Sequence, residues 1–179
     1  MKIFFSSSFG NDLGSQLIRK LTNSKWTHCG LILDEPLPDD SLVAECAWQA
    51  GVRLGTWQAH AGMQFEIYEF ASPAPLAGLN FYRSLAGQSY SYSKVLLYGI
   101  AHIFGETFES KVANFLSKLK MSFFDYRFGM WCSEFVANFF IDYPGILDLS
   151  GVNLENVTPE DLYQLVKSSD KFVLSSSSK

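Results

Sequence analysis

Cys132 has the residue type and the surroundings of a nucleophile for acyl chemistry. It begins the apolar segment "CSEFVANFF" and follows the aromatic stretch "RFGMW". At a helix N-terminus the macrodipole and the free backbone N–H groups favour a thiolate. The same N–H groups can stabilise the oxyanion that forms when a thiolate attacks a carbonyl carbon. Cys132 is therefore the candidate nucleophile.

His28 stands beside Cys29 at the start of the apolar run "THCGLIL", and Glu45 precedes Cys46 in "VAECAW". If both runs are strands, neighbouring side chains point to opposite faces of the sheet, so His28 and Cys29 cannot form a dyad. In a hairpin of the two strands, Glu45 would lie near His28 and accept a bond from its imidazole. Cys29 and Cys46 would share the other, apolar face as buried small hydrophobic residues.

Cys132, His28 and Glu45 together have the parts of a catalytic triad. A thiol with an unperturbed pKa of about 8.5 is mostly protonated at neutral pH, so it needs a nearby base. Glu45 would orient the imidazole, His28 would take the thiol proton, and Cys132 would attack a carbonyl to form an acyl-enzyme. The residues predict cysteine-dependent acyl chemistry.

The elements that position these residues follow from hydrophobic spacing. Alternating or short apolar runs predict strands over 2–6, 27–33, 41–48, 51–55, 64–71 and 171–174. Helical spacing predicts helices over 12–23, 79–87, 93–105, 110–120, 132–142 and 158–168. Thr158 is the expected N-cap of the last helix, with Asp161 as its capping-box partner. Strands followed by helices predict an α+β fold with an antiparallel sheet.

The length of 179 residues suits one domain with a substantial core, which we place at residues 1–174. Hydrophobic residues make up 47% of the chain and charged residues 18%, which is typical of a globular protein. The final "SSSSK", residues 175–179, is predicted to be a disordered tail.

The charge of the chain argues against some classes of partner. A net charge of −4 and a pI near 5.3, without a long Lys/Arg run, argue against nucleic acid. No stretch has the length of a membrane span, and the first residues do not read as a signal peptide. With three cysteines at least one thiol is free, so a cytoplasmic location is the default, with export by a non-classical route as the alternative.

Five segments in order, "SKWTHCGLIL", "LVAECAWQAGVR", "GQSYSYS", "MWCSEFVANFF" and "VTPEDLY", resemble the circularly permuted NlpC-type papain-like cysteine hydrolases. Within these, the similarity is to the YiiX group, with lecithin:retinol acyltransferase as a distant relation. It extends over about residues 2–166. The resemblance implies that His28, Glu45 and Cys132 are the catalytic triad, and that a permuted papain-like core packs a small sheet against the Cys132 helix.

Two aromatic residues are candidates for substrate binding. Tyr90 resembles the tyrosine of a "GxxYD" segment that lines the site in relatives, although Ser91 replaces the usual Asp. Trp131 ends the aromatic stretch before Cys132, and this stretch favours an apolar or aromatic part of the substrate.

Three functions remain open at this stage. The first is hydrolysis of an amide bond, and the analogy with NlpC-type relatives favours a peptide of the peptidoglycan type. The second is acyl transfer, or cleavage of an acyl ester, thioester or lipid, which uses the same acyl-enzyme chemistry. The third is a binding module on the same scaffold without turnover.

A metal site is the least favoured interpretation of the His and Cys residues, and no cofactor is expected. The sequence has no CxxC or HxxxH spacing, and Cys29 would face away from His28. His60, in "WQAHAG", is predicted to lie in an exposed loop. His102, within the apolar run 95–105, is predicted to be a core or edge residue.

Overall fold

The computed structural model describes residues 1–7, 13–33, 41–48, 50–60, 62–74, 76–91 and 129–178. The predicted helices over 93–105 and 110–120, together with His102, lie outside these residues.

All six predicted strands are present, with ends that differ by a few residues from the predicted ones. The strands are β1 (Lys2–Ser7), β2 (His28–Ile32), β3 (Leu42–Ala47), β4 (Gly51–Thr56), β5 (Gln64–Glu69) and β6 (Val173–Ser177). The helices are α1 (Leu13–Thr22), α2 (Ala77–Leu85), α5 (Cys132–Asp142) and α6 (Pro159–Ser168), with short 3₁₀ turns η1 (Trp57–His60) and η3 (Leu154–Asn156).

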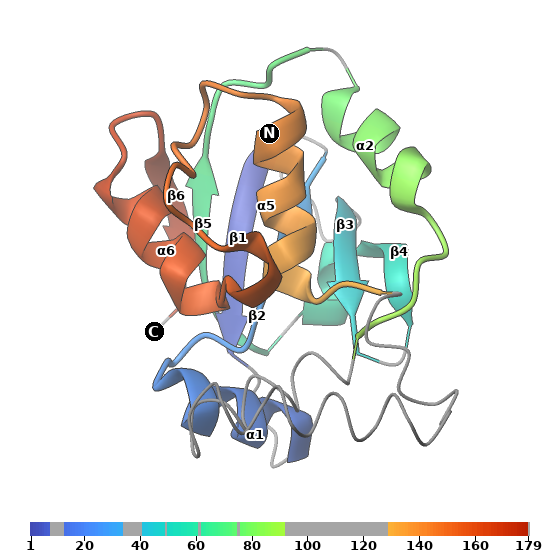
Figure 1. Cartoon of the computed structure of the whole chain (residues 1–179), viewed down its shortest axis with the longest axis vertical. Coiled ribbons are helices and arrows are strands. Elements are labelled where there is room, and N and C mark those ends of the chain that lie inside the picture. Colours follow the sequence, from blue (N-terminus) through green and yellow to red (C-terminus); the bar gives the residue numbers. More distant parts are fainter. Residues whose placement is uncertain are drawn as a thin grey trace.

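The strands form one sheet in the order β4-β3-β2-β1-β5-β6, and every neighbouring pair is antiparallel. Helix α5 lies across the middle of the sheet, in front of β1 and β2 in Figure 1, with α6 beside it. Helix α5 packs mainly on β2 and β3. The predicted mixed α and β fold, with an antiparallel sheet against the helix that begins at Cys132, is confirmed.

The two faces of the sheet carry different cores. On the helix side, alternate strand residues such as Phe5, Cys29 and Leu31 join the buried aromatic residues of α5. On the other side, a smaller apolar cluster of Phe4, Ile32, Val43 and Ile67 is covered by Trp57 and Phe65. The alternation places Cys29 and Cys46 in the helix-side core, as predicted.

Capping interactions fix where the last helix begins. The Thr158 hydroxyl accepts a bond from the Asp161 backbone N–H at 3.1 Å, and the Asp161 carboxylate accepts one from the Thr158 N–H at 2.9 Å. This is the predicted capping box, with Pro159 at the first helical position. The turn before α6 also holds α5, because the Ser133 hydroxyl donates to the Val157 carbonyl at 2.6 Å.

The prediction of a disordered tail is wrong for residues 175–178. Ser175, Ser176 and Ser177 belong to β6, and the Ser178 hydroxyl accepts a bond from the Phe65 N–H at 2.7 Å. Strand pairing uses backbone groups, so the unpaired edge of β5 accepts a serine-rich strand although its side chains contribute little apolar burial. Lys179 lies outside the described residues.

Candidate active site

His28 is the first residue of β2 and lies where β2 and β3 part. The pairing of these two strands consists of Leu31 with Ala44 and Ile32 with Val43, and does not extend to His28 or Glu45. The close approach at this point requires Gly30, because a Cβ there would lie 2.6 Å from the Phe4 ring and 3.0 Å from the Ala44 carbonyl oxygen. The His28 side chain is 20% exposed at this end of the strand.

Glu45 is the centre of a polar cluster on the face of the sheet away from α5. Its side chain is 1% exposed, and its Oε2 atom lies 2.6 Å from Nε2 of His28. Its Oε1 atom accepts bonds from Nε and Nη2 of Arg53 at 2.9 Å and 2.7 Å. Arg53 is its partner on the neighbouring strand β4. The structure therefore brings the predicted His28 and Glu45 side chains into contact and adds Arg53 to them.

His60 also joins this cluster, and the prediction that it lies in an exposed loop is wrong. Its side chain is 5% exposed, and its Nε2 atom lies 3.2 Å from Oε2 of Glu45. The turn η1 folds over the sheet, so the His60 ring packs on Phe4 and Trp57. Within η1, Trp57 lies three positions before His60 and so on the same side of the turn, but a four-residue turn is too short for sequence spacing to reveal this.

The cluster keeps Glu45 ionised. Burial alone would raise the pKa of its carboxyl group, because a charge is poorly solvated there. The hydrogen bond and charge of His28, together with the nearby His60 imidazole, outweigh burial and hold the pKa of Glu45 well below its usual range. A buried carboxylate with these partners can orient and stabilise an imidazolium.

His28 is correspondingly favoured in its protonated form. Burial lowers the pKa of an imidazole, but hydrogen bonds to Cys132 and Glu45 outweigh it and raise the pKa of His28 to about 10. Since Nε2 of His28 faces Glu45, Nδ1 is the nitrogen left to face the Cys132 sulfur. The two ring nitrogens thus serve different partners.

Cys132 is the first residue of α5 and is 2% exposed. A hydrogen bond from the Cys29 thiol, followed by the hydrogen bond and charge of His28, lowers the pKa of Cys132 well below its usual value, although burial opposes this. The thiolate also lies at the positive end of the helix macrodipole. The arrangement favours a thiolate and imidazolium pair in the resting protein.

Cys29 was predicted to be a packing residue, and it is fully buried in the helix-side core. Helix α5 covers the face of β2 to which Cys29 points, so its thiol also influences the pKa of Cys132. Burial, together with the hydrogen bond to Cys132, raises the pKa of Cys29, which keeps this thiol a donor. Cys46 donates to the Met130 carbonyl at 3.0 Å and so holds the segment that leads into Cys132.

Tyr90 and Trp131 both lie in the helix-side core beside the segment that leads into Cys132. Backbone bonds from Ser91 N to the Met130 carbonyl, at 3.1 Å, and from Met130 N to the Ser89 carbonyl, at 3.2 Å, hold Tyr90 next to Met130. Trp131 immediately precedes α5, and its N–H donates to the Glu134 carboxylate at 3.4 Å. Their contact with substrate stays a prediction.

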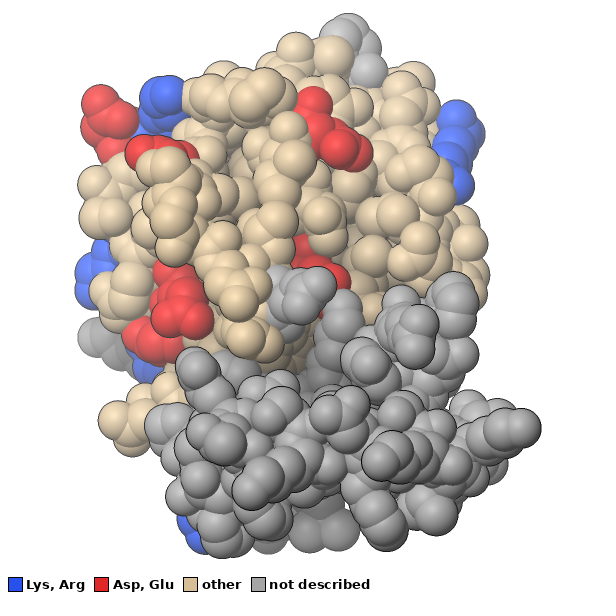
Figure 2. Space-filling view, viewed as in Figure 1, with Lys and Arg blue, Asp and Glu red and all other residues tan. Residues whose placement is uncertain are grey.

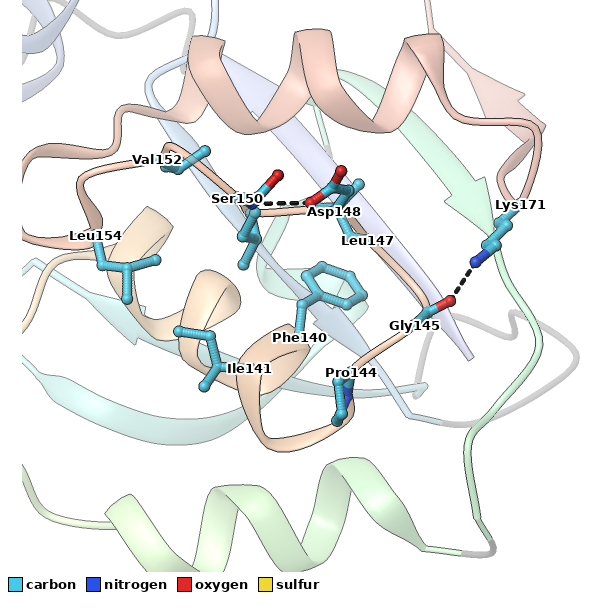
Figure 3. Close-up of a pocket in the computed structure, with 11 residues that line it drawn as sticks. Phe140, Ile141, Pro144, Gly145, Leu147, Asp148, Ser150, Val152, Leu154 and Lys171 are labelled. Carbon is cyan, nitrogen blue, oxygen red and sulfur yellow. Dashed lines mark hydrogen bonds between the residues drawn. The ribbon is translucent and has the colours of Figure 1, made fainter.

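A separate cavity of about 500 Å³ lies at the C-terminal end of α5, the opposite end from Cys132. Figure 3 shows Phe140, Ile141 and Leu147 among the apolar residues that line it. At its margin the Lys171 ammonium donates to the Gly145 carbonyl, and Asp148 accepts a bond from the Ser150 N–H at 2.8 Å. It contains none of the predicted site residues.

The surface gives two further observations on partners. On the face shown in Figure 2, the described Lys and Arg side chains lie near the margins and do not form a continuous basic surface. Within the described ranges, none of the helices combines the length and apolar character of a membrane span. That nucleic acid is not a partner stays a prediction.

Comparison with known proteins identifies the fold. No protein-family model matches the chain, and no curated protein matches it significantly. Among solved structures, the chain is similar to the metalloprotein YiiX from Escherichia coli O157:H7, DUF1105, with a TM-score of 0.59 and 16% sequence identity. The alignment covers 99% of this chain and 96% of that chain. The chain has a YiiX-like fold.

That neighbour is described as a metalloprotein, so the fit of this chain's own residues to a metal ion is relevant. Among the described residues, no group of three or more His, Cys, Asp or Glu side chains is arranged to hold one. His28 and Glu45 are in direct contact at 2.6 Å, which leaves no room for an ion between them. The cluster around Glu45 therefore fits hydrogen bonding better than metal coordination.

Proposed function

We propose that this chain is a cysteine hydrolase with a permuted papain-like core of the NlpC type, and that Cys132, His28 and Glu45 form its triad. The observation that supports this most strongly is the 2.6 Å contact of His28 with a buried, ionised Glu45, while the same imidazole serves a thiol at a helix N-terminus. A buried carboxylate, an imidazole and a low-pKa thiol in series are the parts of an activated nucleophile.

The reaction begins with attack of the Cys132 thiolate on the carbonyl carbon of the substrate. The developing oxyanion is stabilised by backbone N–H groups at the start of α5, which have no partner within the helix. His28 then donates its proton to the leaving amine, and the acyl group stays on Cys132 as a thioester. His28 next takes a proton from water, which attacks the thioester and releases the carboxylic acid. Glu45 stays ionised throughout.

The proposed substrate is an amide bond in a peptide of the peptidoglycan type. A second candidate, an acyl ester or thioester of a lipid, draws support from one observation. The ring of Trp48, which is partly exposed, packs at 5.3 Å on Tyr90, beside the segment that leads into Cys132. An exposed aromatic surface near the nucleophile suits an apolar acyl chain.

Two substrate classes and one labelling reagent test this proposal. We expect wild type to hydrolyse either muropeptides or acyl esters, and Cys132→Ala to lose at least about a thousandfold in rate. Iodoacetamide should label Cys132 much faster than Cys29 or Cys46, and His28→Ala should abolish this preference. Equal, slow labelling of all three cysteines would contradict the enzyme proposal. Rapid labelling without turnover of either substrate class would favour the binding module.

A further inference from the structure

We infer that His60 is a positioning residue of the triad, a second imidazole that holds the Glu45 carboxylate on the oxygen used by His28. This inference rests on the proposed function and adds a fourth side chain to it. His60 does not reach Cys132 through any described contact, so it would act through Glu45 and His28 rather than on the substrate.

The contacts of Glu45 divide between its two oxygens. Arg53 donates twice to Oε1, at 2.9 Å and 2.7 Å. Oε2 faces Nε2 of His28 at 2.6 Å and Nε2 of His60 at 3.2 Å. Both imidazoles thus converge on one oxygen, while the guanidinium holds the other. If the His28 ring moves during proton transfer, His60 is the side chain that still fixes Oε2.

The rings of His60 and His28 are also stacked. Their centroids are 5.9 Å apart, and their planes differ by 6°. On its other sides the His60 ring packs on Phe4 at 4.8 Å and on Trp57 at 5.4 Å. The stack therefore runs from the rigid sheet and η1 to the ring of His28. A ring held in this way limits rotation of His28 out of the plane that serves Glu45 and Cys132.

The hydrogen bonding of His60 argues against packing as its whole role. Neither ring nitrogen makes a well-aligned hydrogen bond within the described structure, and both are buried. The 3.2 Å approach of Nε2 to Oε2 of Glu45 lacks good hydrogen-bond geometry. A buried imidazole with unmade bonds costs stability, so an apolar ring would serve packing alone better. The approach of Nε2 to the carboxylate is the feature an apolar ring would lack.

The test is the pH profile of Cys132 alkylation by iodoacetamide, measured by mass spectrometry on the full chain. His60→Phe keeps an aromatic ring between Phe4 and Trp57 but removes Nε2. We expect its alkylation rate near pH 6 to fall about five- to tenfold, with the acid limb of the profile moved to higher pH. Its Tm should stay within about 3 °C of wild type.

His60→Gln is the matched variant, because its side-chain amide restores an N–H near Glu45. We expect it to alkylate within about twofold of wild type near pH 6. A His60→Phe profile that superimposes on wild type would overturn the inference, and so would a His60→Gln profile as low as that of His60→Phe. If His60→Phe does not fold, His60→Leu replaces it with the same expected results.

His28→Ala in the same assay separates this inference from the proposed function. If His28→Ala collapses the alkylation rate while His60→Phe leaves it unchanged, the triad stands and the role of His60 fails. If His28→Ala leaves the rate and the profile unchanged, Cys132 is not activated by His28, and the proposed function fails with it.

Discussion

The two faces of the sheet are formed by the same strands but bury different kinds of side chain. The helix side is apolar, is covered by α5, and contains the thiols of Cys29 and Cys46. The other side is covered by the short turn η1 and buries the carboxylate of Glu45 with its cationic and imidazole partners. Burial of apolar side chains on the helix side stabilises the fold, whereas burial of the Glu45 charge on the other side costs free energy.

Side chains of the two faces meet at His28, at the start of β2. Strands β2 and β3 are paired at Leu31 and Ile32 but not at His28. A side chain at this unpaired end can therefore contact groups on both faces of the sheet. His28 takes its orienting carboxylate from one side and its thiol from the other. The thiol of Cys132 thus lies with Cys29 on the apolar face, whereas the carboxylate that contacts His28 lies on the charged face.

Glu45→Gln is the largest expected disruption of the charged face. The substitution removes the negative charge that Arg53, His28 and His60 share. We expect the free energy of unfolding to fall by about 3 kcal/mol, because partners of a buried ion lose their counter-charge. Urea denaturation at neutral pH measures this loss. Glu69→Gln, at an exposed position of β5, is the control and should change stability by less than about 0.5 kcal/mol. An equal, small effect of both substitutions would show that the cluster does not depend on charge.

The pH dependence of stability tests the link between the faces. Unfolded, His28 and Cys132 have ordinary pKa values of 6.5 and 9.0, whereas folding raises the first to about 10 and lowers the second. Between about pH 6.5 and 9, the folded and unfolded pair each carry one proton, so this contribution to stability is flat. Above pH 9 the unfolded protein loses the Cys132 proton, while folded His28 keeps its proton up to about pH 10. Below pH 6.5 unfolded His28 gains a proton, while folded Cys132 remains a thiolate to lower pH. Stability therefore falls on both sides.

Cys132→Ala should change this profile in one direction. Without the thiol, the hydrogen bond and charge of Glu45 still act against burial to raise the pKa of His28, so we expect its contribution to be complete below pH 6.5 and to decline as pH rises above it. We expect wild type to be flat, and the variant to lose stability, between about pH 7 and 8.5 in urea denaturation. Parallel profiles would mean that Cys132 and His28 do not titrate as a pair.

The two buried thiols of the apolar face can be compared by the substitutions Cys29→Ala and Cys46→Ala. We expect smaller effects from them than from Glu45→Gln or Cys132→Ala. Cys29→Ala removes the first cause of the lowered pKa of Cys132, so we expect the acid limb of Cys132 alkylation to move to higher pH. Cys46→Ala removes the bond to the Met130 carbonyl and should cost about 1 kcal/mol of stability with little change in that limb. The reverse pattern would contradict the contact of Cys29 with Cys132.

Strand alternation was sufficient to predict the core of the site. It separated His28 from Cys29 and placed His28 with Glu45, because period two fixes which side chains share a face. It could not predict the influence of Cys29 on the pKa of Cys132, since this depends on how closely α5 packs on β2.

His60 and the serine-rich end were missed for different physical reasons. His60 is placed by a 3₁₀ turn whose four residues carry too little periodicity to predict its burial. Residues 175–177 pair through backbone groups, which composition does not report. To predict that Arg53 contacts Glu45, one must know the register of β3 with β4. The sequence did not define the ends of these two runs well enough to fix that register.

Strand β6 has a consequence for how copies of this chain meet one another. It occupies the outer side of β5, from Glu66 paired with Ser177 to Glu69 paired with Val173. Without it, the row of N–H and C=O groups along β5 would be open to pairing with the same row of a second molecule. Strand β6 is thus the outer strand of the sheet, and a short, serine-rich outer strand favours edge-to-edge association less than a long apolar one would.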